Sequence, residues 1–222
     1  MDRYYSEKLA AERLERCYAL APPRIQQYLR AEIEFVDSLL KKGDRALELG
    51  CGYGRVLSGL KTPDVELWGI DTSTVSLKLA ASRLGGRVHL AAMDATSLAL
   101  PAESFDLVFC IQNGMSAFHV DHRTLFAEAV RVTRRGGAAL FSTYTTAVWS
   151  ERLKWFELQA EAGLLGEIDY EKTGDGQIVC KDGFRGTTIS PEQLREWSVQ
   201  LPASISIFEV DSSSLFLRLL KE

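Results

Sequence analysis

The chain has 222 residues, 26 Lys and Arg against 30 Asp and Glu, a formal net charge of −4 and 46% hydrophobic residues. This balance is typical of an ordinary globular protein, and it excludes a disordered or collagen-like chain and a broad basic surface for nucleic acid. The four cysteines are scattered without a C-x-x-C pair, which predicts neither a disulfide framework nor a zinc ribbon and fits a reducing cytosol.

The first part of the chain is predicted to be a helical cap. Residues 7–20 are rich in Leu, Ala, Glu and Arg, and Pro22-Pro23 then breaks the chain. Pro23 suits the first turn of a second helix, which is expected to end at Gly43. The chain begins without the apolar core of a signal peptide, and no stretch approaches the roughly 20 apolar residues that span a bilayer. We therefore expect a cytoplasmic protein without membrane contact.

From residue 45, short apolar runs alternate with helical stretches. The predicted strands are 46–49, 65–70, 88–92, 105–111 and 138–142, and the predicted helices between them are 55–60, 73–84 and 121–133. Such alternation indicates an α/β fold, a doubly wound and mostly parallel sheet with helices on both faces. Near-continuous apolar strands are expected where both faces are covered.

The tail follows a different pattern. We expect a helix over 147–162, a β-rich hairpin over 168–188 turning at residues 174–176, a helix beginning at Ser190, and an antiparallel pair over 204–210 and 214–220. Together with the five earlier strands, this pair makes a seven-stranded sheet. No linker marks a second domain. The prediction is an N-terminal helical cap over 1–42 and a core over 43–222, with 147–189 inserted on the substrate side.

The segment from Ala46 to Arg55 carries the chemistry. A buried strand enters a turn with glycines at 50, 52 and 54, which lets the backbone turn tightly and a ligand approach closely. The spacing is G-x-G-x-G rather than the dinucleotide G-x-G-x-x-G, and Glu48 would repel a pyrophosphate but suits a cation. A dinucleotide loop or a plain tight turn are the alternatives.

An acid followed by G-x-G-x-G resembles the first motif of the class I S-adenosylmethionine-dependent methyltransferases, and the resemblance spans roughly residues 43–145. It implies a Rossmann-like methyltransferase fold. It also implies that Asp71, at the end of the second strand, binds both ribose hydroxyls. The alternative is a cap on the next helix, which Thr72 or Ser73 could supply instead.

Further motifs follow in the same order. Asp94 and Ala95 are similar to the family's adenine-contacting segment, although Asp94 could instead cap its own loop, and residues 105–111 resemble the fourth motif. The resemblance places Gln112 and Asn113 beside the methyl group. The predicted cofactor contacts are Glu48, Gly50, Cys51, Gly52, Gly54, Arg55, Asp71, Thr72, Asp94, Ala95, Ile111, Gln112 and Asn113.

Methyl transfer from a sulfonium is an in-line displacement, so the chain supplies position and electrostatics rather than a covalent nucleophile. The segment 112–118 lacks the N-P-P-[YF] or D-P-P-[YF] signature of amine and amide methylation, and is loosely similar to that of small-molecule members. His119 is a candidate general base; the alternative is a solvated histidine. His119 and His122 lack a third ligand, so no metal site is predicted.

Aromatic residues on the elements expected to cap the strand ends form a candidate lid, which would exclude water and attract a cation. Core packing is the alternative for each of them: Tyr4, Tyr5, Tyr144, Trp149, Trp155 and Phe184. Tyr144 is the best candidate on the acceptor side and a second catalytic candidate. Tyr5, Trp149 and Arg185 are further candidate substrate contacts, and Arg24 could bind a carboxylate.

The sequence therefore predicts an S-adenosylmethionine-dependent methyltransferase acting on nitrogen or oxygen of a small molecule and releasing S-adenosylhomocysteine. The alternatives are a non-catalytic S-adenosylmethionine-binding regulator and an enzyme that methylates RNA or protein. No basic aromatic module for RNA is visible. A homodimer is compatible with the sequence.

Overall fold

The computed structural model describes residue 4 and residues 8–222, and Tyr5 lies outside the described residues. Its centre is a seven-stranded sheet in the order β3-β2-β1-β4-β5-β9-β8. The strands are β1 (Arg45–Leu49), β2 (Glu66–Asp71), β3 (Val88–Ala92), β4 (Phe105–Cys110), β5 (Thr133–Tyr144), β8 (Ala203–Val210) and β9 (Ser214–Lys221). Strands β1 to β5 are parallel, and β9 runs antiparallel to β5 and to β8.

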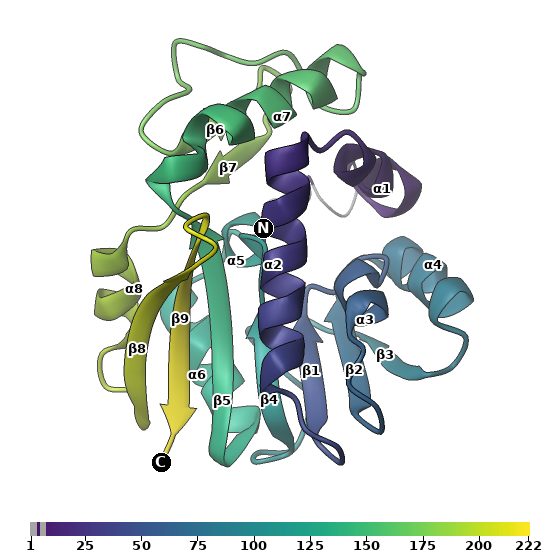
Figure 1. The fold of residues 1–222 in the computed structure, drawn as a ribbon, viewed down its shortest axis with the longest axis vertical. Helices are drawn as coiled ribbons and strands as arrows, with labels where there is room; N and C mark the ends of the chain where they lie inside the picture. Colours follow the sequence, from purple (N-terminus) through teal and green to yellow (C-terminus); the bar gives the residue numbers. More distant parts are fainter. Residues whose placement is uncertain (1–3, 5–7) are drawn as a thin grey trace.

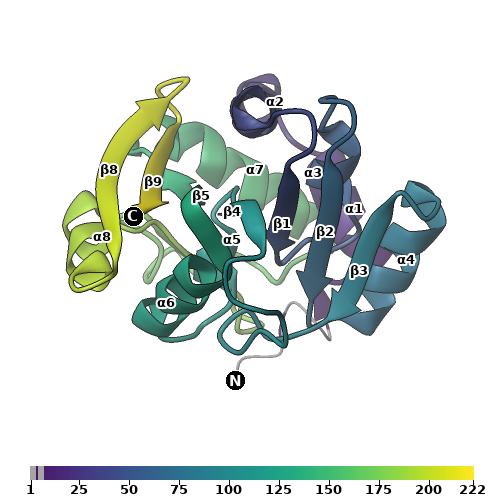
Figure 2. The ribbon, with the colours of Figure 1, turned by 90° about the horizontal axis from the view of Figure 1, so that it is seen from below.

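Helices cover both faces of the sheet, as the alternation predicts. On one face lie α6 (His122–Val132) and α8 (Pro191–Ser198), and on the other lie α2 (Pro23–Leu39), α3 (Arg55–Gly59) and α4 (Thr74–Leu84). Successive strand residues serve opposite faces: Leu47 packs toward α6, whereas Ala46 packs toward α2. Figure 2 shows the sheet between these two layers. The doubly wound architecture is confirmed.

A third hydrophobic cluster lies beyond the carboxyl ends of the parallel strands. It joins α1 (Ala11–Ala19) and the start of α2 to α7 (Trp149–Glu161) and to a separate two-stranded sheet, β6 (Gln177–Val179) with β7 (Arg185–Thr187). In Figure 1, α7 and β6–β7 lie above the strand ends, with α1 beside them. Tyr4, Trp155 and Phe184 are buried in this cluster, so packing accounts for these three aromatic residues.

Two predicted boundaries are wrong. Helix α2 ends at Leu39, because Leu40 is already extended, and Gly43 instead forms the left-handed turn that leads into β1. The hairpin β6–β7 turns at residues 180–184, where the Asp182 carboxylate accepts the Phe184 N–H. Residues 174–177 form their own tight turn before β6, closed by mutual backbone hydrogen bonds between Gly174 and Gln177.

Other local predictions hold. Ser190 caps α8 through a complete capping box: its hydroxyl accepts the Gln193 backbone N–H, and its own N–H donates to the side-chain Oε1 of Gln193. The antiparallel pair β8–β9 is present with regular register. The remaining helices are the short α5 (Gly114–Ala117) and the 3-10 turn η2 (Thr146–Val148).

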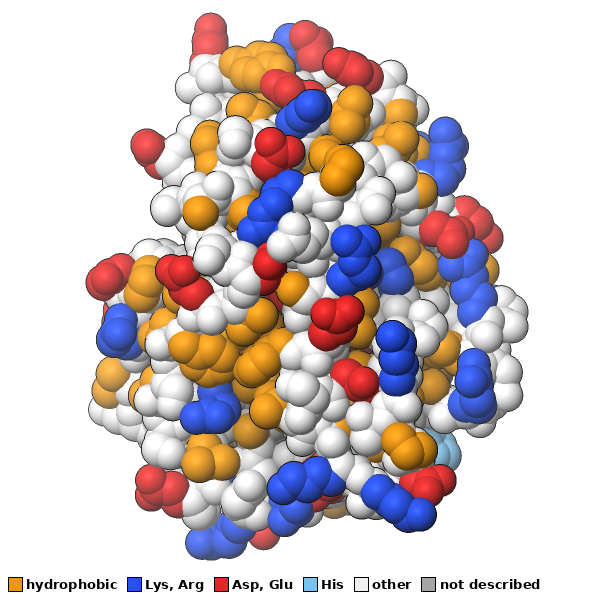
Figure 3. Space-filling model, viewed as in Figure 1, with side chains coloured by type: hydrophobic (Ala, Val, Ile, Leu, Met, Phe, Trp, Pro, Cys, Tyr) orange, Lys and Arg blue, Asp and Glu red, His pale blue; other side chains and the backbone are white. Residues whose placement is uncertain are grey.

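The surface agrees with the near-neutral charge balance. On the face shown in Figure 3, acidic and basic side chains are interspersed. Across the described residues, no helix combines the length and apolarity that crossing a membrane requires.

Candidate active site

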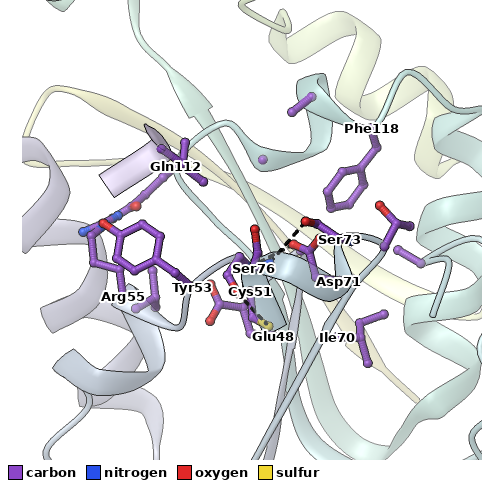
Figure 4. Close-up of a pocket in the computed structure, with 18 of the residues that line it drawn as sticks. Glu48, Cys51, Tyr53, Arg55, Ile70, Asp71, Ser73, Ser76, Gln112 and Phe118 are labelled. Carbon is purple, nitrogen blue, oxygen red and sulfur yellow. Dashed lines mark hydrogen bonds between the residues drawn. The ribbon is translucent and has the colours of Figure 1, made fainter. Parts of the chain in front are cut away.

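A cavity of about 360 Å³ opens at the carboxyl ends of β1, β2 and β3, beneath α1. It lies beside the point where the strand order reverses between β1 and β4, where open α/β sheets bind ligands. Its volume falls within the range of about 300–1,000 Å³ that holds small molecules. Figure 4 shows Gln112 and Arg55 on one side of it and Phe118 on the other.

The glycine turn forms the floor of this cavity. Gly50, Gly52 and Gly54 have φ of 76°, 53° and 82°, in the left-handed region that favours glycine. A Cβ on Gly54 would lie 2.7 Å from Leu84 Cδ1, and one on Gly50 would lie 2.6 Å from the ring of Phe118. The turn is therefore closed to larger residues by conformation and by space. Gly54 itself faces Leu84 and does not line the cavity.

Asp71 ties the glycine turn to the start of α4. Its Oδ2 accepts the Gly52 N–H at 2.9 Å, and its Oδ1 accepts the Ser73 N–H at 2.7 Å. Ser73 caps α4, since its hydroxyl accepts the Ser76 N–H. The capping alternative for Asp71 is thus met by a neighbour, as the sequence suggested, and Asp71 and Thr72 both border the cavity.

Glu48 and Arg55 place a carboxyl group and a guanidinium at the cavity wall. Burial raises the pKa of Glu48 to about 8, and the Arg55 guanidinium opposes that rise. Arg55 lies 4.1 Å from the ring centre of Tyr18. Within the described part of the chain, Glu48 Oε2 and Arg55 Nε are buried without a hydrogen-bond partner. Two unpaired buried atoms beside a cavity are costly, and a ligand with polar groups would satisfy them.

The far side of the cavity is apolar with one carboxylate. Asp94 does cap its own loop, because its Oδ1 accepts the N–H and hydroxyl of Thr96. Asp94 and Ala95 nevertheless line the cavity. Met93 and Phe118 line it nearby. These two, with Leu14, Tyr18 and Ile70, are lining residues that the sequence analysis did not name as contacts.

Of the three cofactor contacts predicted directly after β4, two lie at the cavity wall. Ile111 and Gln112 line the cavity, whereas Asn113 does not. The Asn113 amide donates to Ser116 Oγ and to the Thr187 carbonyl, and its oxygen accepts the Thr143 hydroxyl. Asn113 therefore fastens β7 to the sheet, and the structure does not bring it to the cavity wall.

The candidate catalytic and substrate residues are spread over several places. Tyr144 and Trp149 line a second cavity, of about 610 Å³, between the end of β5, η2–α7 and residues 188–191. His119 is exposed and lies outside both cavity walls, as does Arg185. Arg24 forms an ion pair with Asp211 at 2.6 Å.

His122 is a structural residue of α6. Its ring stacks on Trp197 with centroids 4.2 Å apart, and burial lowers its pKa.

Known proteins resemble this chain in sequence and in fold. Residues 46–137 match a family model described as a methyltransferase domain. The 27-O-demethylrifamycin SV methyltransferase of Amycolatopsis mediterranei (strain S699) is 34% identical over 105 residues, which are 44% of this chain and 38% of that protein. The chain thus matches well under half the length of that curated relative.

Two solved structures illustrate the likeness of fold. A putative S-adenosylmethionine-dependent methyltransferase from Methanococcus maripaludis superposes with a TM-score of 0.69 at 16% identity, over 100% of this chain and 95% of that one. A methyltransferase from Thermotoga maritima, described as a possible histamine N-methyltransferase, gives 0.67 at 18% identity over 100% of both chains. At these identities the structures establish the shared fold.

Proposed function

Because the chain carries a class I S-adenosylmethionine-dependent methyltransferase domain, we propose that it transfers a methyl group from S-adenosylmethionine to a nitrogen or oxygen atom of a small molecule. The observation that carries the proposal is the first cavity, which brings together the glycine turn and the strand-end carboxylates of Asp71 and Asp94. The buried polar atoms of Glu48 and Arg55 that lack a partner among the described residues lie at the same cavity. The curated relative, which is named as a 27-O-demethylrifamycin SV methyltransferase, supports a small-molecule acceptor.

The cofactor of this domain family is S-adenosylmethionine, and the residues present fit it. Asp71 would hold the ribose, and Asp94 with the Ala95 N–H would hold the adenine beside Met93. The unpaired oxygen of Glu48 suits an ammonium group, as the Arg55 guanidinium suits a carboxylate, so an amino-acid group would satisfy both. When bound, this cofactor supplies a methyl group on a positively charged sulfur.

The chain's own contribution is orientation and exclusion of water. Alignment of reacting groups supplies up to about 7–11 kcal/mol in ideal intramolecular reactions. The glycine turn is anchored to β2 by the N–H groups of Gly50 and Cys51, which both donate to the Ile70 carbonyl. Helix α1 covers the cavity with Leu14 and Tyr18. Ionised Glu48 favours a cationic ligand over a neutral one.

The second cavity is the proposed acceptor site. Tyr144, Trp149 and Leu215 give it an aromatic and aliphatic wall, and Thr188 and Ser190 add hydroxyl groups. Such a mixture suits a small organic molecule that carries a few polar atoms. Tyr144 also packs on Tyr28 of α2, with ring centroids 4.9 Å apart. The insertion thereby serves as the acceptor side of the domain.

Calorimetric titration with S-adenosylhomocysteine tests the cofactor site of the whole chain. Transfer of a labelled methyl group to panels of small amines and phenols, of RNA and of protein then tests the acceptor class. We expect binding of S-adenosylhomocysteine and label in the small-molecule panel. Binding without any label would favour the regulatory alternative, and label in RNA or protein would refute the small-molecule assignment.

A further inference from the structure

Glu32 is a carboxyl group without exposed surface in the middle of α2. Its Oε2 accepts the Gln112 backbone N–H at 2.6 Å and the Ser142 hydroxyl at 2.9 Å. Its Oε1 has no hydrogen-bond partner of normal length in the described part of the chain, and the Ser214 side chain of β9 lies nearby and favours the ionised form. Because an incompletely paired buried acid is costly, a neutral residue here would serve folding better, and the acid calls for another explanation.

Helix α2 holds the turn after β4 through Gln112. This residue and Asn113 have φ of 59° and 60°, a conformation that non-glycine residues keep only where their surroundings impose it. The Gln112 backbone N–H donates to Glu32 and also to the Ser142 hydroxyl at 2.8 Å, and its side-chain N–H donates to the Leu29 carbonyl at 3.0 Å. The same Gln112 lines the first cavity. The conformation of this cavity wall therefore depends on contacts with α2.

Among Glu32 and the three titratable side chains that face it, Glu32 is the group with a pKa near neutral. Tyr28 of α2, Tyr144 of β5 and Cys110 of β4 face it, and burial raises the pKa of each above its ordinary value, so all three stay neutral. Arg55 contributes a favourable positive charge. Burial raises the pKa of Glu32 itself to about 7, and the nearby Ser214 hydroxyl and the hydrogen bonds from Ser142 and Gln112 oppose that rise.

We propose that Glu32 is a positioning residue for methyl transfer, whose carboxylate holds the Gln112–Asn113 turn in the conformation that shapes the methyl side of the cavity. Protonation of Glu32 replaces a charge-assisted hydrogen bond to Gln112 by a weaker neutral one. The inference rests on the proposed function only in assigning this wall to the methyl group.

The direct test is the Gln112 amide signal in a proton–nitrogen correlation spectrum of the ligand-free chain between pH 5.5 and 8.5. We expect its proton to move downfield as pH rises, with a midpoint near 7, because a carboxylate is the stronger acceptor. Glu32→Gln should abolish the shift, and Glu34→Gln, an exposed acid on the same helix, should preserve it. Ser142→Ala removes a donor to the carboxylate together with a second acceptor of the Gln112 N–H, so the amide signal itself should move at every pH, while the midpoint of its titration should move upward.

Calorimetry with S-adenosylhomocysteine links this signal to the site. At pH 8 we expect Glu32→Gln to weaken binding about tenfold relative to the unaltered chain and to Glu34→Gln, and by less at pH 6, where Glu32 is mostly protonated. Glu48 titrates in a similar range, so the Gln112 amide identifies which acid is responsible.

The outcomes separate the two claims. An amide of Gln112 that does not titrate in the unaltered chain, or unchanged affinity in Glu32→Gln at pH 8, would overturn the role of Glu32. Failure of the unaltered chain to bind S-adenosylhomocysteine would overturn the proposed function, whatever the amide does. If Glu32→Gln does not fold, the amide titration of the unaltered chain and the Ser142→Ala shift still decide the matter.

Discussion

Asp71 joins the two halves of the proposed donor site, and its replacement tests that site directly. Its carboxylate receives one hydrogen bond from the glycine turn and one from the start of α4. In the proposed complex it would also accept both ribose hydroxyls. A hydrogen bond to a charged group contributes about 1.5–3 kcal/mol, and the low end applies in an open cavity where water competes. Asp71→Ala should then cost about 3 kcal/mol of binding, or about 150-fold in Kd.

Asp71→Asn gives an intermediate case. The amide keeps one acceptor oxygen and presents an N–H to the other partner, so we expect a loss of about tenfold. Asp64→Asn is the matched control, since Asp64 is an exposed residue paired with Lys42 at the surface. Calorimetric titration with S-adenosylhomocysteine measures all three, and circular dichroism checks that each is folded. Affinity within threefold of the unaltered chain in folded Asp71→Ala would refute the ribose role.

Three further predictions concern stability. Burial raises the pKa of Glu48 from 4.5 to about 8, so the native state binds more protons than the unfolded one between these values, and the free energy of unfolding should fall as pH rises through them. Glu48→Gln should flatten this dependence in urea titrations at several pH values; an unchanged slope would contradict the assignment. Gly54→Ala should cost about 2–3 kcal/mol in the same assay, through left-handed strain and contact with Leu84, whereas Gly85→Ala, in open space, should cost about 1 kcal/mol; equal costs would exclude the steric part. Ser190→Ala removes the capping box of α8 and should cost about 1 kcal/mol, which calorimetry would register as a Tm lower by about 2–4 °C, and an unchanged Tm would refute it.

Several features of this protein lie in short segments whose local structure is set by residues close in the chain. The glycine turn requires left-handed φ at fixed positions, and the capping box at Ser190 closes within four residues. Asp71 ends β2 and Asp94 comes shortly after β3, and parallel strands bring their carboxyl ends to one edge. For these reasons the alternation of strands and helices, the turn and the strand-end acids could be predicted from the pattern of residues.

Other parts of the site depend on segments that are distant in the chain. Tyr18 lines the cavity because α1 packs across it, and Asn113 turns away because Thr143 and Thr187 satisfy its amide. The second cavity likewise forms where η2–α7 and residues 188–191 meet the end of β5.

The amino-acid sequence by itself determined the α/β alternation, the glycine turn and the acids beside it, because each follows from backbone geometry and hydrogen bonds within a few residues. Only the tertiary structure decided that Glu32, an acid on an amphipathic helix like its exposed neighbour Glu34, is buried against Gln112. The rotation of α2 against the sheet selects between two such residues, and that rotation results from packing along the whole helix rather than from any local pattern.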